Sequence, residues 1–311
     1  MTADEGPGGP AAGAGRFAPS PSGALHLGNL RTALLAWLFA RSTGREFLIR
    51  IEDLDRVAPG AAGGQLRDLA ALGIDHDRAP VRQRDRTQRY ADAIEQLVRR
   101  GLTYECFCTR REIREAALAP HGAPLEGRYR GICRRLGAEQ IAVRRAAGRP
   151  PALRLKSQVA SLRVVDRQLG TYTGMVEDIV LRRNDGLAAY NLAVVVDDHA
   201  QGVDQVVRGD DLLPSTPAQV HLSELLEIPI PEYAHVPLAL NPAGQRLAKR
   251  DGAVTLPDLI DRGWTPGGVL DLLAGSLGMT GGSPAELLTD FRPAELPRTP
   301  WIVDPTALLP L

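Results

Sequence analysis

Residues 16–41 read RFAPSPSGALHLGNLRTALLAWLFAR, and this stretch determines the kind of fold that we expect. It predicts a short strand, a turn broken by two prolines, and a helix over residues 30–41, where apolar side chains recur at helical spacing. A second strand is predicted over residues 46–52, EFLIRIE. The order strand, glycine-containing turn, helix and strand is typical of the start of a parallel sheet in an α/β protein.

The rest of the chain is expected to complete this sheet around an insertion. Residues 105–165 hold all three cysteines and many arginines, and we expect them to separate two halves of the sheet domain, residues 16–104 and 166–240. Residues 1–15 are expected to be a disordered tail, and residues 241–311 a polar loop followed by short helices. Further helices are predicted over residues 65–72, 87–100 and 217–226, and further strands over residues 186–197 and 235–240. The strand at 186–197 is almost continuously apolar, as a strand buried on both faces would be.

The chain has 311 residues with 37 basic and 37 acidic side chains, so its formal net charge is zero. The basic residues are unevenly spread, because residues 81–167 hold 20 of them against 9 acidic residues. Such a segment is typical of a surface that binds a polyanion such as RNA. It is equally typical of a solvated, arginine-rich helical surface, and charge alone leaves both interpretations open.

The apolar runs and the start of the chain argue against a membrane or secreted protein. The longest unbroken apolar stretch covers residues 33–40, far short of the roughly 20 residues that span a bilayer. Residues 1–15 contain no lysine or arginine, unlike the start of a signal peptide. Three cysteines are too few for a disulfide scaffold. We therefore expect a cytoplasmic protein with no membrane partner. We also expect it to work as a monomer.

Two short motifs carry groups suited to phosphate. His26, Gly28 and Asn29 lie where the first helix is expected to begin, and a helix N-terminus offers free N–H groups and a positive dipole end. Residues 246–250, RLAKR, contain Lys249, one of only two lysines in the chain. Lysine and arginine differ as phosphate ligands, so a retained lysine indicates a local role. Taken singly, the first motif is explained as well by an ordinary turn and the second by a basic surface loop.

Together, the two motifs resemble the HIGH and KMSKS signatures of class I aminoacyl-tRNA synthetases. The resemblance implies a Rossmann-type sheet that binds ATP through His26, Gly28, Asn29 and Lys249, with His26 and Lys249 as catalytic residues. The chain departs from KMSKS at its first lysine, here Arg246, and at its serine, here Ala248. Further blocks narrow the resemblance to the glutamyl group, over roughly residues 16–255: RFAPSPSG at 16–23, RTALL at 31–35, RIEDLDR at 50–56, YNLA at 190–193, VDDH at 196–199 and VRGDD at 207–211.

The glutamyl resemblance also implies a glutamate pocket. A planar arginine fork suits a carboxylate, and a carboxylate suits an ammonium group. Arg16 and Arg208 are therefore expected to bind the two substrate carboxylates, in an order left open, and Glu52 the ammonium. Each residue alone would be explained as well by an ion pair at a strand end. The full expected set is Arg16, Phe17, Ala18, Pro19, Ser20, Glu52, Tyr190 and Arg208.

The cysteines are candidates for a structural zinc site. Zinc favours four tetrahedral ligands and thiolate sulfur, and Cys106, Cys108 and Cys133 offer three. The sequence alone makes His121 the obvious fourth ligand, whereas the family pattern C-x-C…Y-x3-C implies Tyr129. Buried cysteines without a metal are the simpler alternative. A metal would help an arginine-rich segment that buries little apolar surface to fold.

Only about 55 residues follow the Arg246 loop, too few for the anticodon-binding region of a full glutamyl-tRNA synthetase. The chain resembles instead the stand-alone paralogs of that catalytic domain. The resemblance implies that it activates L-glutamate with ATP and Mg²⁺ without tRNA, and attaches the glutamate to the queuosine base at the wobble position of tRNA(Asp). The alternatives are a truncated synthetase that charges a tRNA 3′ end and an inactive RNA-binding paralog.

Overall fold

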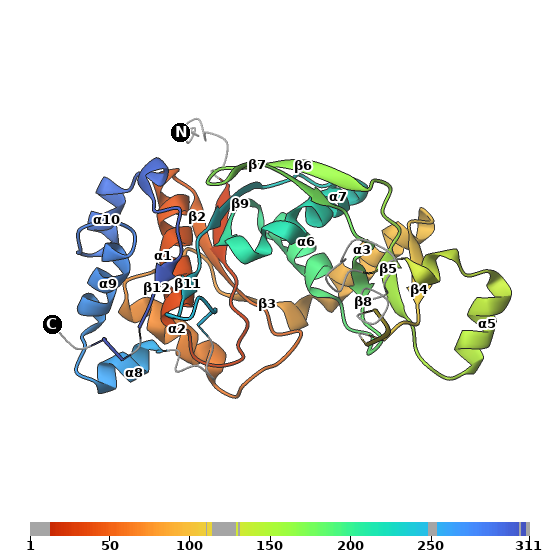
Figure 1. Cartoon of the computed structure of the whole chain (residues 1–311), viewed down its shortest axis with the longest axis horizontal. Helices are drawn as coiled ribbons and strands as arrows, with labels where there is room; N and C mark the ends of the chain where they lie inside the picture. The colour runs from red at the N-terminus through yellow and green to blue at the C-terminus, as the bar shows by residue number, and fades with distance from the viewer. Residues whose placement is uncertain are drawn as a thin grey trace, which may run out of the picture.

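The computed structural model describes residues 13–109, 111–113, 129, 131–247, 254–304 and 306–308. Their central feature is a seven-stranded sheet whose neighbouring strands run parallel, except for the antiparallel pair at one edge. The predicted α/β fold with a mainly parallel sheet is therefore confirmed (Figure 1). Across the sheet, the strands are β3 (Val81–Arg82), β2 (Glu46–Ile51), β1 (Ala14–Phe17), β9 (Val203–Gly209), β10 (Glu232–Val236), β6 (Ser161–Asp166) and β7 (Gly170–Met175).

Helix α1 (Leu27–Ser42) lies at the centre of the main hydrophobic core. It packs on β1 and β9, and most of its side chains are buried. A helix that is apolar nearly all round also needs cover on its outer side, and the C-terminal helices supply it. There Phe39 meets Phe291 edge to face, with 5.2 Å between the ring centroids. The expected short C-terminal helices are confirmed as α8 (Leu256–Asp261), α9 (Pro266–Gly275) and α10 (Pro284–Asp290).

The strand predicted over residues 186–197 was wrong, because this segment leads into helix α6 (Tyr190–Gln201). A segment buried on every side is apolar throughout, whether it forms a strand or a helix, so the pattern does not distinguish them. α6 contacts β9 and the helices α3 (Thr87–Arg99) and α7 (Thr216–Leu226). It brings the buried carboxylates of Asp197 and Asp198 within ion-pair range of Arg50 on β2.

Strands of the arginine-rich insertion form a small antiparallel sheet together with a strand from further along the chain. This sheet consists of β4 (Thr103–Cys106), β5 (Ala152–Leu155) and β8 (Val180–Arg182), and α5 (Ala138–Ala146) precedes β5. The expected limits of the insertion, 105 and 165, need correction, because β4 begins at Thr103 and residue 165 lies inside β6 of the main sheet. The hairpin of β6 and β7 joins the main sheet before β8 returns to the small one. In Figure 1, α5 lies at the opposite end of the molecule from α8–α10.

Several other predicted boundaries shift by a few residues. β1 begins at Ala14, inside the tail expected over 1–15. The strand expected over 235–240 divides around Pro237, because proline has no N–H to continue the ladder. The expected helices are confirmed as α2 (Ala61–Ala71), α3 and α7. The remaining elements are β11 (Ala239–Leu240), which pairs with β12 (Trp301–Ile302), and the 3-10 turns Gln83–Arg86, Ile132–Arg135, Asp210–Ser215 and Pro293–Glu295.

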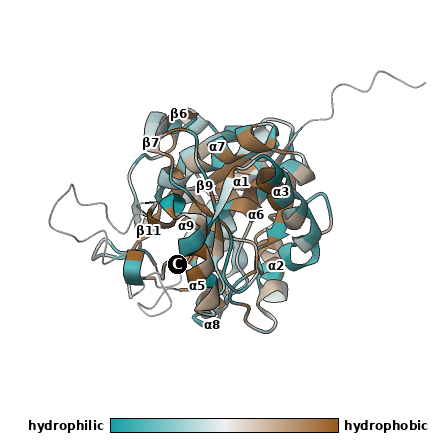
Figure 2. Ribbon diagram, turned by 90° about the vertical axis from the view of Figure 1, so that its right-hand side faces the viewer, coloured by the Kyte–Doolittle hydropathy of each residue, from teal (hydrophilic) through white to brown (hydrophobic). Residues whose placement is uncertain are grey.

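Hydrophobic segments gather in the interior, around α1 and β9, and hydrophilic segments lie toward the outside (Figure 2). The core is therefore organised around the sheet and α1.

In the part of the chain that the structure describes, no helix is both long enough and apolar enough to cross a membrane.

We expect Leu38→Ala in α1 to lower the free energy of unfolding by about 2–5 kcal/mol, because it leaves a cavity in a close-packed core. Leu38 is 0% exposed. Urea titration followed by circular dichroism would measure the change. Val143→Ala in α5 is the control, because Val143 is 65% exposed and its truncation should cost less than about 0.5 kcal/mol. Equal effects of the two substitutions would contradict this picture of the core.

Candidate active site

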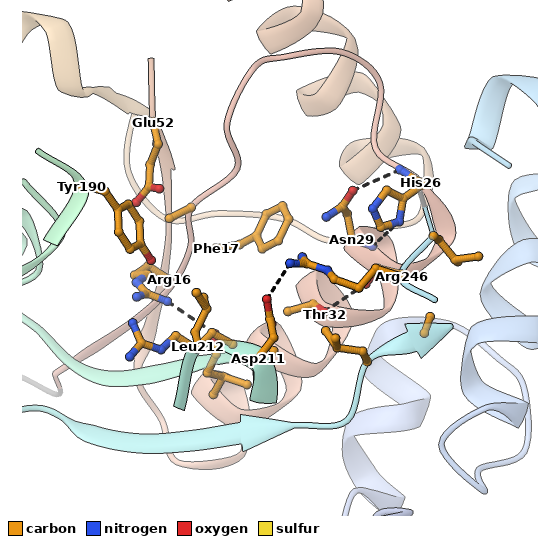
Figure 3. Close-up of a pocket in the computed structure, with 18 residues that line it drawn as sticks. Arg16, Phe17, His26, Asn29, Thr32, Glu52, Tyr190, Asp211, Leu212 and Arg246 are labelled. Atoms are coloured by element: carbon orange, nitrogen blue, oxygen red, sulfur yellow. Dashed lines mark hydrogen bonds and ion pairs between the residues drawn. The ribbon is translucent and has the colours of Figure 1, made fainter. Parts of the chain in front are cut away.

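A cleft opens at the carboxyl ends of β1 and β9, beside the start of α1. Ligands of open parallel sheets bind at this edge, where the strands end and the loops begin. Figure 3 shows Glu52, Tyr190 and Arg16 on one side of the cleft and His26, Asn29 and Arg246 on the other. The residues that line it are Arg16, Phe17, Ala18, His26, Gly28, Asn29, Thr32, Glu52, Tyr190, Val207, Arg208, Gly209, Asp211, Leu212, Leu238, Ala239, Arg246 and Leu247.

The cleft therefore unites most of the residues that the sequence predicted for the ATP and glutamate sites. Pro19 and Ser20 are not among its lining residues. Lys249, and with it Ala248, lies outside the residues that the structure describes.

His26 caps the N-terminus of α1. Its Nδ1 accepts a hydrogen bond from the backbone N–H of Asn29 at 3.3 Å, and the Asn29 side-chain oxygen accepts one from the backbone N–H of His26 at 3.3 Å. Burial, together with the nearby Arg246 charge, lowers the pKa of His26 to about 4. The imidazole is consequently neutral at pH 7. Because Nδ1 accepts, the proton is carried by Nε2, which remains a hydrogen-bond donor.

Both sides of the second motif meet this helix start. Arg246 lines the cleft together with His26 and forms an ion pair at 2.6 Å with Asp211, which lies just after the end of β9. On the other side of the motif, the Val254 carbonyl accepts a hydrogen bond from the Leu27 N–H at 3.0 Å. Gly28 leaves little free space, since a Cβ there would lie 3.1 Å from the His26 ring. His26 and Arg246, about 220 residues apart in sequence, therefore line the same cleft.

At the other side of the cleft, Arg16 is held by a buried carboxylate. Asp198 on α6 accepts hydrogen bonds from Nε and Nη2 of Arg16, at 3.1 and 3.3 Å. It also accepts one from Nη1 of Arg50 at 2.6 Å, and Arg50 in turn pairs with Glu52 at 3.2 Å. This network fixes the orientation of Arg16 and Glu52 before any substrate binds.

The charges in this network respond differently to burial. Burial opposes ionisation of Asp198, yet Arg16 and Arg50 hold the pKa of its carboxyl below the usual range. Burial raises the pKa of Glu52 and outweighs the attraction of Arg50 and Arg16. Burial and the Glu52 charge also raise the pKa of Tyr190, so its hydroxyl stays protonated. An incoming ammonium group would offset the desolvation of Glu52.

Arg208 on β9 has one guanidinium nitrogen still to be satisfied. Its Nε donates to Nε2 of His235 at 3.0 Å, and its Nη2 donates to the Thr216 hydroxyl at 2.9 Å. Nη1 is buried and has no hydrogen-bond partner among the described residues. A buried guanidinium N–H without an acceptor is costly, and a substrate carboxylate in the cleft would supply one.

The three cysteines form a second cluster, between β4 and the turn Ile132–Arg135. Their sulfur atoms lie within 4.8 Å of one another, and those of Cys108 and Cys133 are 3.5 Å apart. The Tyr129 hydroxyl accepts a hydrogen bond from the Cys133 N–H at 2.8 Å, and Arg154 lies 3.8 Å from the Tyr129 ring centroid. Three close thiols beside a phenol oxygen fit the ligand preferences of zinc. His121 lies outside the described residues.

Sequence reasoning missed the residues that orient the site without being part of its motifs. Asp198 stood in a quoted block, VDDH, but the segment before it was expected to be a strand, which hid its contact with Arg16. Thr32 and Asp211 also line the cleft. The acidic Asp210 and Asp211 at the end of β9 were a signal that could have indicated a partner for Arg246.

Residues 14–291 match the family model of the class I tRNA synthetases (E and Q), catalytic domain. The fold agrees, because a solved glutamate tRNA ligase from Elizabethkingia meningosepticum, in complex with its amino acid, superposes with a TM-score of 0.80. That structure is 28% identical, over 96% of this chain and 68% of its own. The fold and the site thus define an aminoacyl-tRNA synthetase, which is an ATP-dependent ligase.

Comparison with individual proteins narrows this class. A glutamyl-Q tRNA(Asp) synthetase from Nocardia farcinica is 64% identical over 297 residues, which cover 96% of this chain and 95% of that protein. A glutamate–tRNA ligase from Nitrosospira multiformis is 39% identical, over 83% of this chain but only 56% of the ligase. The chain belongs to the glutamyl-Q tRNA(Asp) synthetase family within the class I synthetases.

We expect His26→Asn to make the protein less sensitive to acid. The pKa of His26 lies at about 4 in the folded protein, against about 6.5 for an unperturbed histidine, so the unfolded chain binds a proton that the folded chain excludes. Stability from this residue is present above pH 6.5 and is lost as the pH falls toward 4, by an amount on the order of 2–3 kcal/mol. Asparagine keeps the helix cap but does not titrate.

Urea unfolding of wild type and His26→Asn at pH 7.5 and pH 4.5 measures this difference. The wild type should lose more stability between the two pH values than the variant. Equal losses in the two proteins would show that His26 is already charged, or already free of its cap, in the folded state.

Proposed function

We propose that this protein activates L-glutamate with ATP and transfers it to the queuosine base at the wobble position of tRNA(Asp). A glutamate carboxylate oxygen attacks the α-phosphorus of ATP, giving glutamyl-adenylate and pyrophosphate. A queuosine hydroxyl then attacks the activated carbonyl, and AMP leaves. The observation that carries the proposal is the single cleft in which buried arginines meet a helix N-terminus, in a chain 64% identical to a protein named for this reaction.

The glutamate half of the cleft supplies complementary charges. We assign one substrate carboxylate to Arg208, whose Nη1 is buried and lacks an acceptor among the described residues. Arg16, fixed by Asp198, provides the second positive charge. Glu52 faces the substrate ammonium, and Tyr190 offers a protonated hydroxyl beside it.

The loop that follows Arg16 completes this half of the cleft. Phe17 and Ala18 form part of the wall. Pro19 and Ser20 belong to the same loop, although neither lines the cleft.

The ATP half supplies groups that favour a developing negative charge. The N-terminus of α1, the Nε2–H of His26 and the Asn29 side chain lie at one place in the cleft. We propose that they stabilise the phosphates as pyrophosphate leaves, and that Lys249 adds an ammonium to the same transition state. Mg²⁺ bound with ATP would supply further charge neutralisation. Catalysis would then rest on positioning and electrostatics, without a covalent enzyme intermediate.

The RNA surface that we propose is smaller than the charge of residues 81–167 suggests. Several of its arginines pair with acidic residues far away in sequence, such as Arg100 with Glu227 at 3.1 Å and Arg167 with Glu232 at 2.8 Å. Other arginines of this segment are exposed and have no ion pair with a distant acidic residue among the described residues. Arg89 and Arg135 are two of them. We propose that such residues contact the tRNA backbone. Binding should therefore weaken as salt rises.

We further propose one structural zinc ion, held by Cys106, Cys108, Cys133 and Tyr129. The close thiols and the neighbouring phenol oxygen support this set, and His121 remains the competing fourth ligand. The zinc would hold β4 against the turn that carries Cys133. We also propose that the protein acts as a monomer in the cytoplasm.

The acceptor is tested with labelled glutamate, ATP and purified tRNAs. We expect label on tRNA(Asp) that carries queuosine, and also on its isolated anticodon stem-loop, because an unstacked loop base is accessible where a helical base is not. The same loop with guanosine in place of queuosine should stay unlabelled. Label on the 3′ adenosine of tRNA(Glu), independent of queuosine, would establish the 3′-charging alternative. The inactive-paralog alternative predicts no glutamate-dependent ATP–pyrophosphate exchange.

Metal analysis of the freshly purified protein should find about one zinc per chain, because a structural site needs four ligands for one ion. Cys108→Ser should remove it. Tyr129→Phe and His121→Ala form a matched pair, and only the first should weaken zinc retention against a chelator. Loss of zinc in His121→Ala alone would assign the fourth ligand to His121, and absence of zinc from the wild type would overturn the site.

A further inference from the structure

A buried chain of three side chains crosses the sheet behind the glutamate half of the cleft. Asp166, His235 and Arg208 lie on the neighbouring parallel strands β6, β10 and β9, and His235 and Arg208 are register partners. All three are buried, with exposed fractions of 3%, 0% and 5%. Asp166 and His235 are absent from the cleft lining, whereas Arg208 belongs to it.

The hydrogen bonds give this chain a direction. Nδ1 of His235 lies 2.6 Å from Oδ2 of Asp166, and Nε2 lies 3.0 Å from Nε of Arg208. Arginine Nε–H only donates, so Nε2 must be the acceptor and the His235 proton must lie on Nδ1, where it is donated to Asp166. This single tautomer satisfies both contacts.

The surroundings keep His235 neutral. Burial lowers the pKa of His235, and the Arg208 charge lowers it further. Together they outweigh the negative charges of Asp166 and Asp210, which raise this pKa. Burial opposes ionisation of Asp166, but hydrogen bonds from His235 and from the backbone N–H groups of 168, 169 and 235 hold its pKa low. A charged carboxylate therefore faces a neutral imidazole.

We propose that His235, oriented by Asp166, is a positioning residue that sets the direction of the Arg208 guanidinium and thereby the affinity for glutamate. Its neutral Nε2 accepts Nε–H, and Thr216 accepts from Nη2, so two of the three nitrogens are fixed and Nη1 is left for the substrate. The inference rests on the proposed assignment of Arg208 to a substrate carboxylate. Because His235 acts through Arg208, it should affect the affinity for glutamate. The affinity for ATP, which we place at the other side of the cleft, should not change.

Two substitutions of His235 separate this role from a purely structural one. The amide of His235→Asn reaches the place of Nδ1 and can still donate to Asp166, but it provides nothing at the place of Nε2. The amide oxygen of His235→Gln reaches the place of Nε2 and can accept from Arg208. Steady-state ATP–pyrophosphate exchange gives the KM for glutamate and the KM for ATP of each variant.

Asp166→Asn tests the tautomer while leaving His235 in place. Oδ1 of Asp166 accepts from the backbone N–H groups of Gln168 and Leu169, at 2.9 and 3.0 Å. The amide oxygen of the variant must stay there, so its NH₂ group would face Nδ1 of His235. The imidazole would then carry its proton on Nε2, opposite the Nε–H of Arg208, and could no longer accept from it.

We expect His235→Asn and Asp166→Asn each to raise the KM for glutamate by about tenfold or more, the scale of losing one charge-assisted hydrogen bond. The KM for ATP should change by less than about twofold, and His235→Gln should recover most of the glutamate affinity. His221→Asn is the matched control. His221 is also buried, and its Nε2 accepts from the Gln158 N–H at 3.1 Å, but it is not part of the cleft lining, so the KM for glutamate should not change.

Arg208→Gln distinguishes failure of the inference from failure of its premise. If Arg208→Gln raises the KM for glutamate but Asp166→Asn and His235→Asn do not, the positioning role is overturned and the assignment of Arg208 survives. If Arg208→Gln leaves that KM unchanged, the assignment of Arg208 is wrong and the inference falls with it. If His235→Asn does not fold, Asp166→Asn and His235→Gln still decide the question, because they preserve the size of the buried side chains more closely.

Discussion

The buried carboxylate of Asp198 is the interaction on which the glutamate half of the cleft depends. It pairs with Arg16 on β1 and Arg50 on β2, and thus connects α6 to the two strands that begin the fold. Burying these charges is costly, and the cost is offset only because the members satisfy one another. Removing Asp198 would leave the buried Arg16 without its ion-pair partner, and Arg50 with only Glu52 and the more distant Asp197. The same network directs Arg16 and Glu52 toward the cleft, so fold stability and the proposed recognition of glutamate share one set of ion pairs.

Much of the fold and of the site could be predicted from short segments. The strand–turn–helix order near residues 16–41 indicated a parallel sheet because its elements have local signals: apolar residues at helical spacing, and prolines and a glycine in the turn. The two signature motifs were expected to work together, and the structure brings Arg246 and the start of α1 to one cleft. The fold supplies this proximity, since β9 returns beside β1 and β10 pairs with β9.

What could not be predicted depends on contacts between distant residues. The apolar run before Asp197 gave no indication of helix or strand, because burial on all sides removes the periodicity that separates them. The partners of Arg208 were hidden for a related reason: Asp166 and His235 are adjacent only through strand order. The unpaired positive charge of residues 81–167 is smaller than the sequence suggests. A count within one segment leaves out acidic partners from elsewhere in the chain, such as Glu227 and Glu232.

The position of β1 in the sheet also has a consequence for biosynthesis. Ala14 pairs on one side with Glu46 of β2 and on the other with Val203 of β9. At a translation rate of roughly 5–20 residues per second, the first partner is made within about 10 s, but the second follows only after about 10–40 s. During this interval the nascent chain exposes an unpaired strand edge beside the apolar surface of α1. The ribosome-bound protein thus passes through a stage in which a chaperone would compete with aggregation for the same edge.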